Sequence, residues 1–242
     1  MNECVISKGE CGYCGIRKNK NGKLSAEGVL KGNFSFFFDN LPTNCVSYQV
    51  CAGCTGAGYP RFSCCPSCEL QNKSMGVFLN SCSFNCAFCQ NYNFLENIKL
   101  TKFQNSKVLV NSIKKDVSCV CFFGGDPSTQ LPFTVKVANE SLAENKGRIL
   151  RFCWETNGTM NEKLLDEILG ISLKTGGCVK FDIKMFDERL SIALTGITNK
   201  RTLSNFARAA KWFEMRKTPP LVTASTLLIP CYIEETEVKN IS

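Results

Sequence analysis

From residue 75 onward the sequence alternates between short apolar runs and longer amphipathic stretches, and this alternation restricts the folds open to the chain. The apolar runs are residues 76–80, 119–123, 149–154, 178–183 and 221–229. The amphipathic stretches are residues 107–115, 132–145, 161–174 and 201–216. Buried strands that alternate with helices build βαβ units around a parallel sheet. The sequence therefore predicts an α/β fold.

Polar motifs follow four of the apolar runs, each where a predicted strand ends. They are residues 82–89, 124–127 (Gly-Gly-Asp-Pro), 155–158 (Glu-Thr-Asn-Gly) and 182–184 (Asp-Ile-Lys). The carboxyl ends of parallel strands meet at one rim, which is where (β/α) barrels carry their active sites. We therefore expect a (β/α) barrel, open or closed, with a functional site at that rim.

The first motif holds three cysteines, Cys82, Cys86 and Cys89, in the spacing C-x3-C-x2-C. Loops that bind iron–sulfur clusters normally supply four thiolates. Three would leave one iron of a [4Fe–4S] cluster without a protein ligand, and an open coordination position distinguishes a reactive metal site from a structural one. The alternative is a surface loop or part of a zinc knuckle.

The chain has 17 cysteines and no histidine among its 242 residues. Without histidine there is no imidazole general base, no Ser-His-Asp triad and no histidine-ligated zinc or haem. Any metal is therefore held by sulfur or carboxylate. A reducing cytosol disfavours disulfides and favours metal binding by such thiols, and their sensitivity to oxidation indicates an anaerobic cell.

The cysteines are concentrated at the N-terminal end, because nine of them lie in residues 1–70 among many glycines and turn residues. We predict that this segment is a Cys-rich N-terminal extension and that residues 71–242 form the main domain. Short strands are expected near residues 24–30 and 34–38.

Within the extension, Cys51-x2-Cys54 and Cys65-x2-Cys68 resemble the two knuckles of a four-thiolate site. A structural zinc and an auxiliary iron–sulfur cluster both suit this pattern. Unliganded thiols remain a third interpretation, since glycine-rich loops collect such pairs by chance.

Neither a membrane span nor an export signal is visible in the sequence. No apolar run approaches the about 20 residues that cross a bilayer, and the N-terminus lacks the layout of a signal peptide. We therefore expect a cytoplasmic protein. The formal net charge of +8 suits a solvated surface or a docking face for an acidic electron carrier, whereas no basic block interleaved with aromatic residues argues for nucleic-acid binding.

The motifs carry a resemblance to a known family. The cysteine triplet followed by Gly-Gly-Asp-Pro resembles the radical S-adenosylmethionine (SAM) superfamily. Further motifs of the chain resemble one branch of this superfamily, the pyruvate formate-lyase activating enzymes and activase-related proteins of anaerobes. These are residues 155–158, 182–184, 194–196 (Leu-Thr-Gly) and 228–230 (Leu-Ile-Pro). The likeness runs from about residue 76 to the C-terminus.

The resemblance implies a function. The three thiolates would hold a [4Fe–4S] cluster whose open iron chelates the amino and carboxylate groups of SAM. One electron, supplied by a flavodoxin- or ferredoxin-like donor, would cleave SAM and give a 5′-deoxyadenosyl radical that abstracts hydrogen from a substrate. By the same resemblance, that substrate is a backbone glycine of a glycyl-radical enzyme or another protein substrate.

The resemblance also assigns roles to residues of the first two strand ends. Gly124 and Gly125 let the backbone approach the ligand closely. Asp126 accepts a hydrogen bond from the ammonium group of SAM, and Pro127 fixes the turn. Phe88 lies near the adenine. The alternatives are an ordinary strand-to-helix turn for the first four residues and plain packing for Phe88.

The next two strand ends complete the expected SAM site. Glu155 and Asn157 would hold ribose hydroxyls or polar groups of the methionine moiety. Asp182 and Lys184 would point into the site from the following strand. As opposite charges, they have the alternative of simply pairing with each other.

Two interpretations from other classes remain open. One is a non-catalytic iron–sulfur protein that transfers electrons, and the other is a zinc-binding interaction protein. Relatives of the branch continue beyond the strand that ends near residue 229 with at least one more strand and helix. We therefore expect the chain to be a fragment, with a barrel that is incomplete at the C-terminus.

Overall fold

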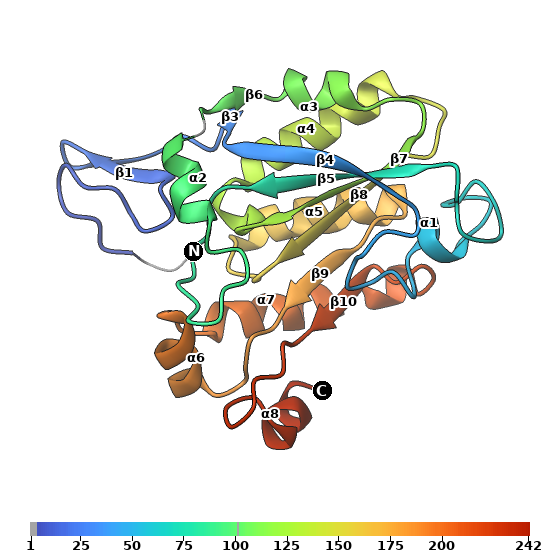
Figure 1. Ribbon diagram of the computed structural model, residues 1–242. Helices are drawn as coiled ribbons and strands as arrows, with labels where there is room; N and C mark the ends of the chain where they lie inside the picture. Colours follow the sequence, from blue (N-terminus) through green and yellow to red (C-terminus); the bar gives the residue numbers. More distant parts are fainter. Residues whose placement is uncertain (1–3, 101) are drawn as a thin grey trace.

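A six-stranded sheet organises the computed structural model, which describes residues 4–100 and 102–242 (Figure 1). The strand order is β10-β9-β8-β7-β5-β4, and every neighbouring pair is parallel except β4 with β5. The strands are β4 (Phe34–Asn40), β5 (Lys73–Leu79), β7 (Val117–Gly124), β8 (Arg151–Thr156), β9 (Val179–Asp182) and β10 (Val222–Ser225). The predicted α/β fold with a mostly parallel sheet is confirmed.

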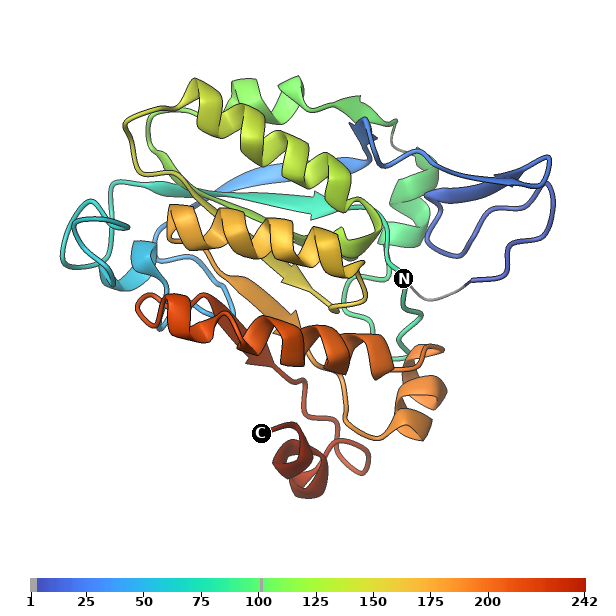
Figure 2. The same cartoon turned by 180° about the vertical axis from the view of Figure 1, so that it is seen from behind.

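The main helices form a layer on one face of this sheet (Figure 2). They are α3 (Lys107–Ser112), α4 (Leu131–Glu144), α5 (Glu162–Thr175) and α7 (Lys200–Ala210). Alternate strand residues point into this layer, and Phe122, Trp154 and Phe181 are fully buried there. The hydrophobic core therefore lies between the sheet and the helices.

The helices begin and end where local sequence dictates. Asn161 caps α5 by accepting a hydrogen bond from the backbone N–H of Lys163 at 3.0 Å, and Gly176 ends it with φ of 83°. None of the helices in residues 4–100 and 102–242 has the length and apolar character needed to cross a membrane.

Several element boundaries differ from the sequence-based expectations. The predicted strand 221–229 ends at Ser225, and the predicted helix 201–216 ends at Ala210 before a short 3-10 turn, Phe213–Met215. The sequence-based prediction gave no bounds for three short helices of the structure. They are α2 (Phe94–Leu100), α6 (Glu188–Thr195) and α8 (Glu235–Ile241).

The N-terminal segment contributes directly to the sheet. It begins with the hairpin β1 (Arg17–Lys20) and β2 (Lys23–Ala26), and β3 (Lys31–Gly32) then pairs with β6 (Gln104–Asn105). The predicted strand 34–38 is β4, which pairs with all seven residues of β5. A single helical turn, α1 (Ala52–Thr55), follows.

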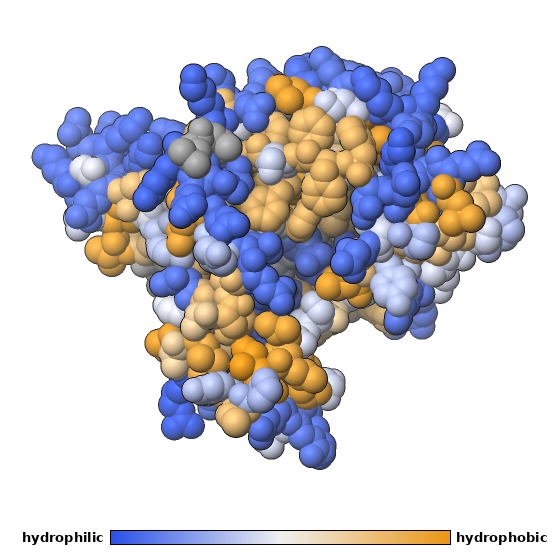
Figure 3. Space-filling view, in the orientation of Figure 1, coloured by the Kyte–Doolittle hydropathy of each residue, from blue (hydrophilic) through white to orange (hydrophobic). Residues whose placement is uncertain are grey.

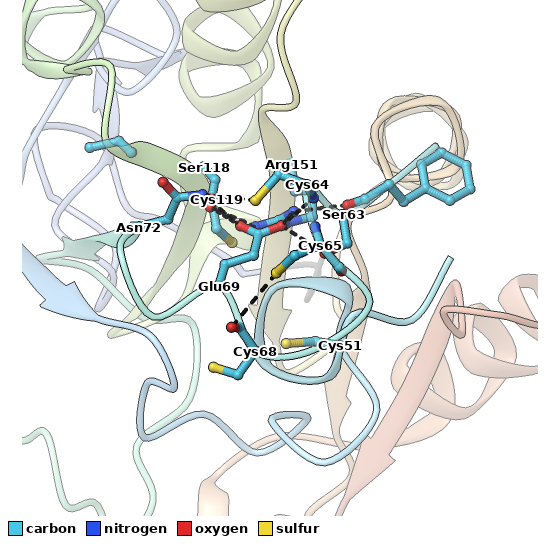
Figure 4. A network of polar contacts seen from close by, with 12 residues as sticks. Cys51, Ser63, Cys64, Cys65, Cys68, Glu69, Asn72, Ser118, Cys119 and Arg151 are labelled. Carbon is cyan, nitrogen blue, oxygen red and sulfur yellow. Dashed lines mark hydrogen bonds and ion pairs between the residues drawn. The ribbon is translucent and has the colours of Figure 1, made fainter. Parts of the chain in front are cut away.

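A buried ion pair anchors the cysteine-rich loop after α1 to the sheet (Figure 4). Arg151 of β8 donates to both carboxylate oxygens of Glu69 at 2.8 Å, and the two side chains are 2% and 0% exposed. The same carboxylate accepts from Ser63 and Ser118 at 2.9 and 2.7 Å. This network fixes the loop against β7 and β8, because each oxygen of Glu69 has several donors.

Candidate metal and cofactor site

The loop that carries the cysteine triplet leaves β5 at the carboxyl-terminal rim of the sheet. Cys82 is buried, and Cys86 and Cys89 are half-buried. The backbone N–H groups of Asn85 and Ala87 donate to carbonyls at the end of α6, at 2.9 and 2.8 Å. The middle of the loop is therefore held against the end of α6.

One cavity of about 320 Å³ collects the predicted residues of the cluster and SAM site. Its lining includes Cys82, Cys86, Phe88, Cys89, Gly124, Gly125, Asp126, Glu155, Asn157, Asp182 and Lys184. Pro127 is buried just behind it, at the start of a 3-10 turn (Pro127–Thr129). The four strand ends thus meet at one cavity, and the three cysteines of the loop are the cysteines that line it.

Gly124 and Gly125 are required by the backbone around them. Gly124 has φ of 105°, a conformation that favours glycine. A Cβ atom on Gly125 would lie 2.3 Å from the carbonyl oxygen of Ser81. The glycines therefore allow β7 to pass close to the start of the cysteine loop.

Asp126 is 3% exposed, and its carboxylate is already surrounded by donors. It accepts from the backbone N–H of Ser128 at 2.7 Å and of Asn157 at 2.5 Å, and from the hydroxyl of Thr156 at 3.1 Å. Burial raises the pKa of Asp126 to about 6. Asp126 therefore links the end of β7 to the end of β8. These hydrogen bonds fix the position of residues 155–158 relative to β7.

Asn157 is held above the first cysteine. Its side-chain amide donates to the hydroxyl of Ser83 at 3.2 Å and lies 3.9 Å from the sulfur of Cys82. Glu155 lines the same cavity with a side chain that is 31% exposed, and burial raises the pKa of its carboxyl. Both residues present polar atoms to a ligand in the cavity.

Asp182 and Lys184 form an ion pair with each other at the opposite wall. The ammonium group of Lys184 also lies 5.7 Å from the centre of the Phe88 ring. Although burial lowers the pKa of Lys184, the charge and hydrogen bond of Asp182 raise it, so the residue stays cationic. The pair gives this wall one fixed charge of each sign.

Sequence reasoning missed Tyr13, which comes from the N-terminal segment and lies beside the cysteine loop. Its hydroxyl donates to the side chain of Asn85 at 2.9 Å, and its ring meets Phe94 edge-on at 6.3 Å. Burial and the neighbouring cysteines raise its pKa. No periodicity or motif marks this residue, because its role depends on a contact across 72 positions of sequence.

The cysteine quartet predicted in the extension lies in a different neighbourhood (Figure 4). Cys51 and Cys54 share a thiol–thiol hydrogen bond, and burial together with the nearby Cys51 and Cys65 raises the pKa of Cys68. Throughout residues 4–100 and 102–242, however, no three Cys, Asp, Glu or His side chains surround a position for a single ion. Metal binding by the quartet stays a prediction.

The donors of the cavity fit a [4Fe–4S] cluster with one open iron. Three thiols supply three of the four ligands that such a cluster takes. The polar side chains of Glu155, Asn157 and Asp182 are available to a small polar ligand beside it. The loop, the aromatic ring and the charged pair are therefore suited to a cluster with a small polar ligand beside it.

Comparison with known families supports this geometry. The sequence matches the radical SAM superfamily over residues 77–238, which is more than half of the chain and contains every motif that lines the cavity. Comparison with curated proteins gives no match. The match and the site together show that the chain belongs to the radical SAM superfamily.

Proposed function

We propose that the protein is an enzyme that cleaves S-adenosylmethionine reductively and uses the resulting radical to abstract hydrogen from a substrate. A [4Fe–4S] cluster supplies the electron for this chemistry when it is bound. The observation that carries the proposal is the single cavity in which three thiols face the polar ends of three further strands.

The residues of the chain would divide the work as follows. Cys82, Cys86 and Cys89 hold the cluster and leave one position for SAM. Asn157 and Glu155 orient the polar groups of SAM from β8. Phe88 offers an aromatic face to the adenine, and its ring is kept in position by the nearby ammonium group of Lys184.

Asp126 would act through its neighbours. Its carboxylate accepts from two backbone N–H groups and one hydroxyl, so it sets the position of Asn157. The sequence predicted a direct hydrogen bond from the ammonium group of SAM to Asp126. That bond would require one of these three donors to give up its hydrogen bond to the carboxylate. We therefore assign it the positioning of the strand ends.

The wider architecture suits the same proposal. We propose that the parallel sheet is one wall of a (β/α) barrel whose carboxyl-terminal rim carries the site. The net charge of +8 favours docking of an acidic flavodoxin- or ferredoxin-like electron donor. The ordered motifs at residues 155–158 and 182–184 support, by resemblance, a glycyl-radical enzyme as the substrate protein.

The decisive experiment is anaerobic reconstitution with iron and sulfide, reduction with dithionite and addition of SAM, followed by chromatography for 5′-deoxyadenosine. The wild-type protein is expected to form this product. Cys86→Ala is expected to lose the visible absorption of the loop cluster and all product. Cys4→Ala, which changes an exposed cysteine outside the cavity, is the matched control and is expected to behave as the wild type.

A fully reconstituted wild-type protein that yields no 5′-deoxyadenosine would refute the enzymatic proposal and favour an electron-transfer protein. The activase role has its own test. Incubation with a glycyl-radical enzyme encoded beside the gene is expected to give the electron paramagnetic resonance signal of a glycyl radical, and its absence with active protein would point to another substrate.

A further inference from the structure

The sheet face opposite the helices presents a second set of cysteines. Strand residues alternate between the two faces, so Phe122 and Trp154 enter the helix layer while their neighbours point the other way. On β7 the residues that point the other way include Cys119 and Cys121, and on β8 they include Cys153. This is the face turned toward the viewer in Figure 1.

These cysteines line a cavity of about 440 Å³. Cys45 and Cys51 of the N-terminal segment also line it, as does Cys178, the residue just before β9. Phe123 and Glu155 line both this cavity and the predicted SAM site. Figure 3 shows apolar surface gathered on the same side of the molecule.

A buried lysine lies among the thiols. The ammonium group of Lys180 donates to the sulfur of Cys45 at 2.8 Å and to the sulfur of Cys121 at 3.3 Å. The nearest carboxylate is that of Glu155, at 4.0 Å, and the lysine side chain is 3% exposed. This carboxylate is at the distance limit of an ion pair and the ammonium group is buried, so a further negatively charged partner would lower the cost of burying it.

The thiols also lie close to one another. The sulfurs of Cys119 and Cys153 are 3.9 Å apart. Cys121 and Cys153 are direct partners in the register of β7 and β8. A free cysteine often serves as a small apolar residue, but apolar packing does not explain thiols that face a cavity and share a buried ammonium group.

We infer that four thiols of this face hold a second, polynuclear iron–sulfur cluster. They are Cys45, Cys119, Cys121 and Cys153, and they supply the four thiolates that such clusters take. Lys180 donates to two of these sulfurs, those of Cys45 and Cys121, and its charge offsets the negative charge of the thiolates. Cys178 is left out because its thiol lies against the hydroxyl of Thr223, at 3.5 Å.

A dinuclear [2Fe–2S] cluster suits the spacing of these thiols better than one zinc ion does. Zinc draws four sulfurs to about 2.3 Å from a single point. In residues 4–100 and 102–242 no three side chains are set around such a point, and this holds equally for the Cys82–Cys89 loop. A [2Fe–2S] cluster places two cysteine sulfurs on each iron, which the 3.9 Å between the sulfurs of Cys119 and Cys153 allows. It also keeps the two pairs of sulfurs apart, because two irons and two sulfides lie between them.

The test uses a background in which Cys82, Cys86 and Cys89 are all changed to serine, so that the loop cannot hold a cluster. After reconstitution with ferrous iron and sulfide, this variant is expected to keep about two irons and two sulfides per chain. Further replacement by Cys121→Ser and Cys153→Ser is expected to remove them. The matched control Cys178→Ser is expected to leave them in place.

A second series separates this site from the quartet in the N-terminal segment. In the same background, Cys54→Ser, Cys65→Ser and Cys68→Ser together are expected to leave the iron content unchanged. Loss of iron in that variant, no iron in the parent background, or zinc in place of iron after incubation with both metals would each overturn the inference.

Lys180→Met gives a readout that does not depend on removing a ligand. The variant is expected to bind the same iron in the loop-free background, with a more negative reduction potential, because a nearby positive charge and its hydrogen bonds to sulfur are gone. An unchanged potential would overturn the inference. Circular dichroism shows whether the variant with both Cys121→Ser and Cys153→Ser folds. If it does not fold, the reduction potential of Lys180→Met still tests the inference.

Discussion

The buried pair of Glu69 and Arg151 offers the sharpest test of what holds the N-terminal segment to the sheet. Removing either partner leaves the other charge buried, which costs about 3–5 kcal/mol. Glu69→Leu also strands the hydroxyl of Ser118 and other donors. We therefore expect Glu69→Leu and Arg151→Met each to lower the free energy of unfolding by about 3–5 kcal/mol.

The double variant decides between a coupled pair and two independent contributions. With both charges removed, no unpaired ion remains, so we expect the double variant to lose about as much as Glu69→Leu alone. The coupling energy is then about 3 kcal/mol, at the upper end of the range measured for residues in contact. The assay is urea unfolding followed by circular dichroism under reducing, anaerobic conditions.

An exposed pair supplies the control for this cycle. Arg208 and Asp166 lie 2.6 Å apart with side chains 41% and 32% exposed, so Asp166→Asn is expected to cost less than about 1 kcal/mol. If the losses of Glu69→Leu and Arg151→Met simply add within about 0.5 kcal/mol, the reasoning from buried charge is refuted.

Two further predictions concern the end of β7. Gly125→Ala places a Cβ atom 2.3 Å from a backbone oxygen, so we expect thermal unfolding to show a loss of about 1–3 kcal/mol. Gly170→Ala, inside α5 with open space around it, is the control and should gain about 0.5–1 kcal/mol. Burial raises the pKa of Asp126 from 3.8 to about 6, so its contribution to stability is present below pH 3.8 and lost as the pH rises through 6. That loss is about 3 kcal/mol, and urea unfolding from pH 4 to 7 should show a flatter profile for Asp126→Asn; an equal slope would contradict the assignment.

The sequence predicts the sheet well because its parallel strands are buried on the helix side and carry continuous apolar runs. The runs near residues 119–123 and 149–154 become β7 and β8 with small shifts. Helix α6 was not predicted because few of its side chains are buried, so its sequence has no clear apolar periodicity. Its signals were nevertheless present, since Asp187 caps its start and Gly196 ends it.

The candidate site was predicted in part by topology alone. Motifs at the ends of parallel strands must meet at one rim, so the cavity collects almost all of them. The hydrogen-bond partners of Asp126 could not be derived from the sequence. They depend on how far β7 and β8 each extend toward the rim of the sheet. Contacts over long sequence separations, such as Tyr13 with Asn85 and Arg151 with Glu69, have no local pattern.

The pairing of β4 with β5 has a practical consequence for anyone who shortens the chain. A protein beginning at residue 71 would lose β4 and leave the seven residues of β5 with unpaired N–H and C=O groups along one side. Exposed, apolar strand edges of this kind recruit other chains and aggregate. The cysteine-rich segment therefore also protects the edge of β5 and prevents aggregation of the protein through that edge.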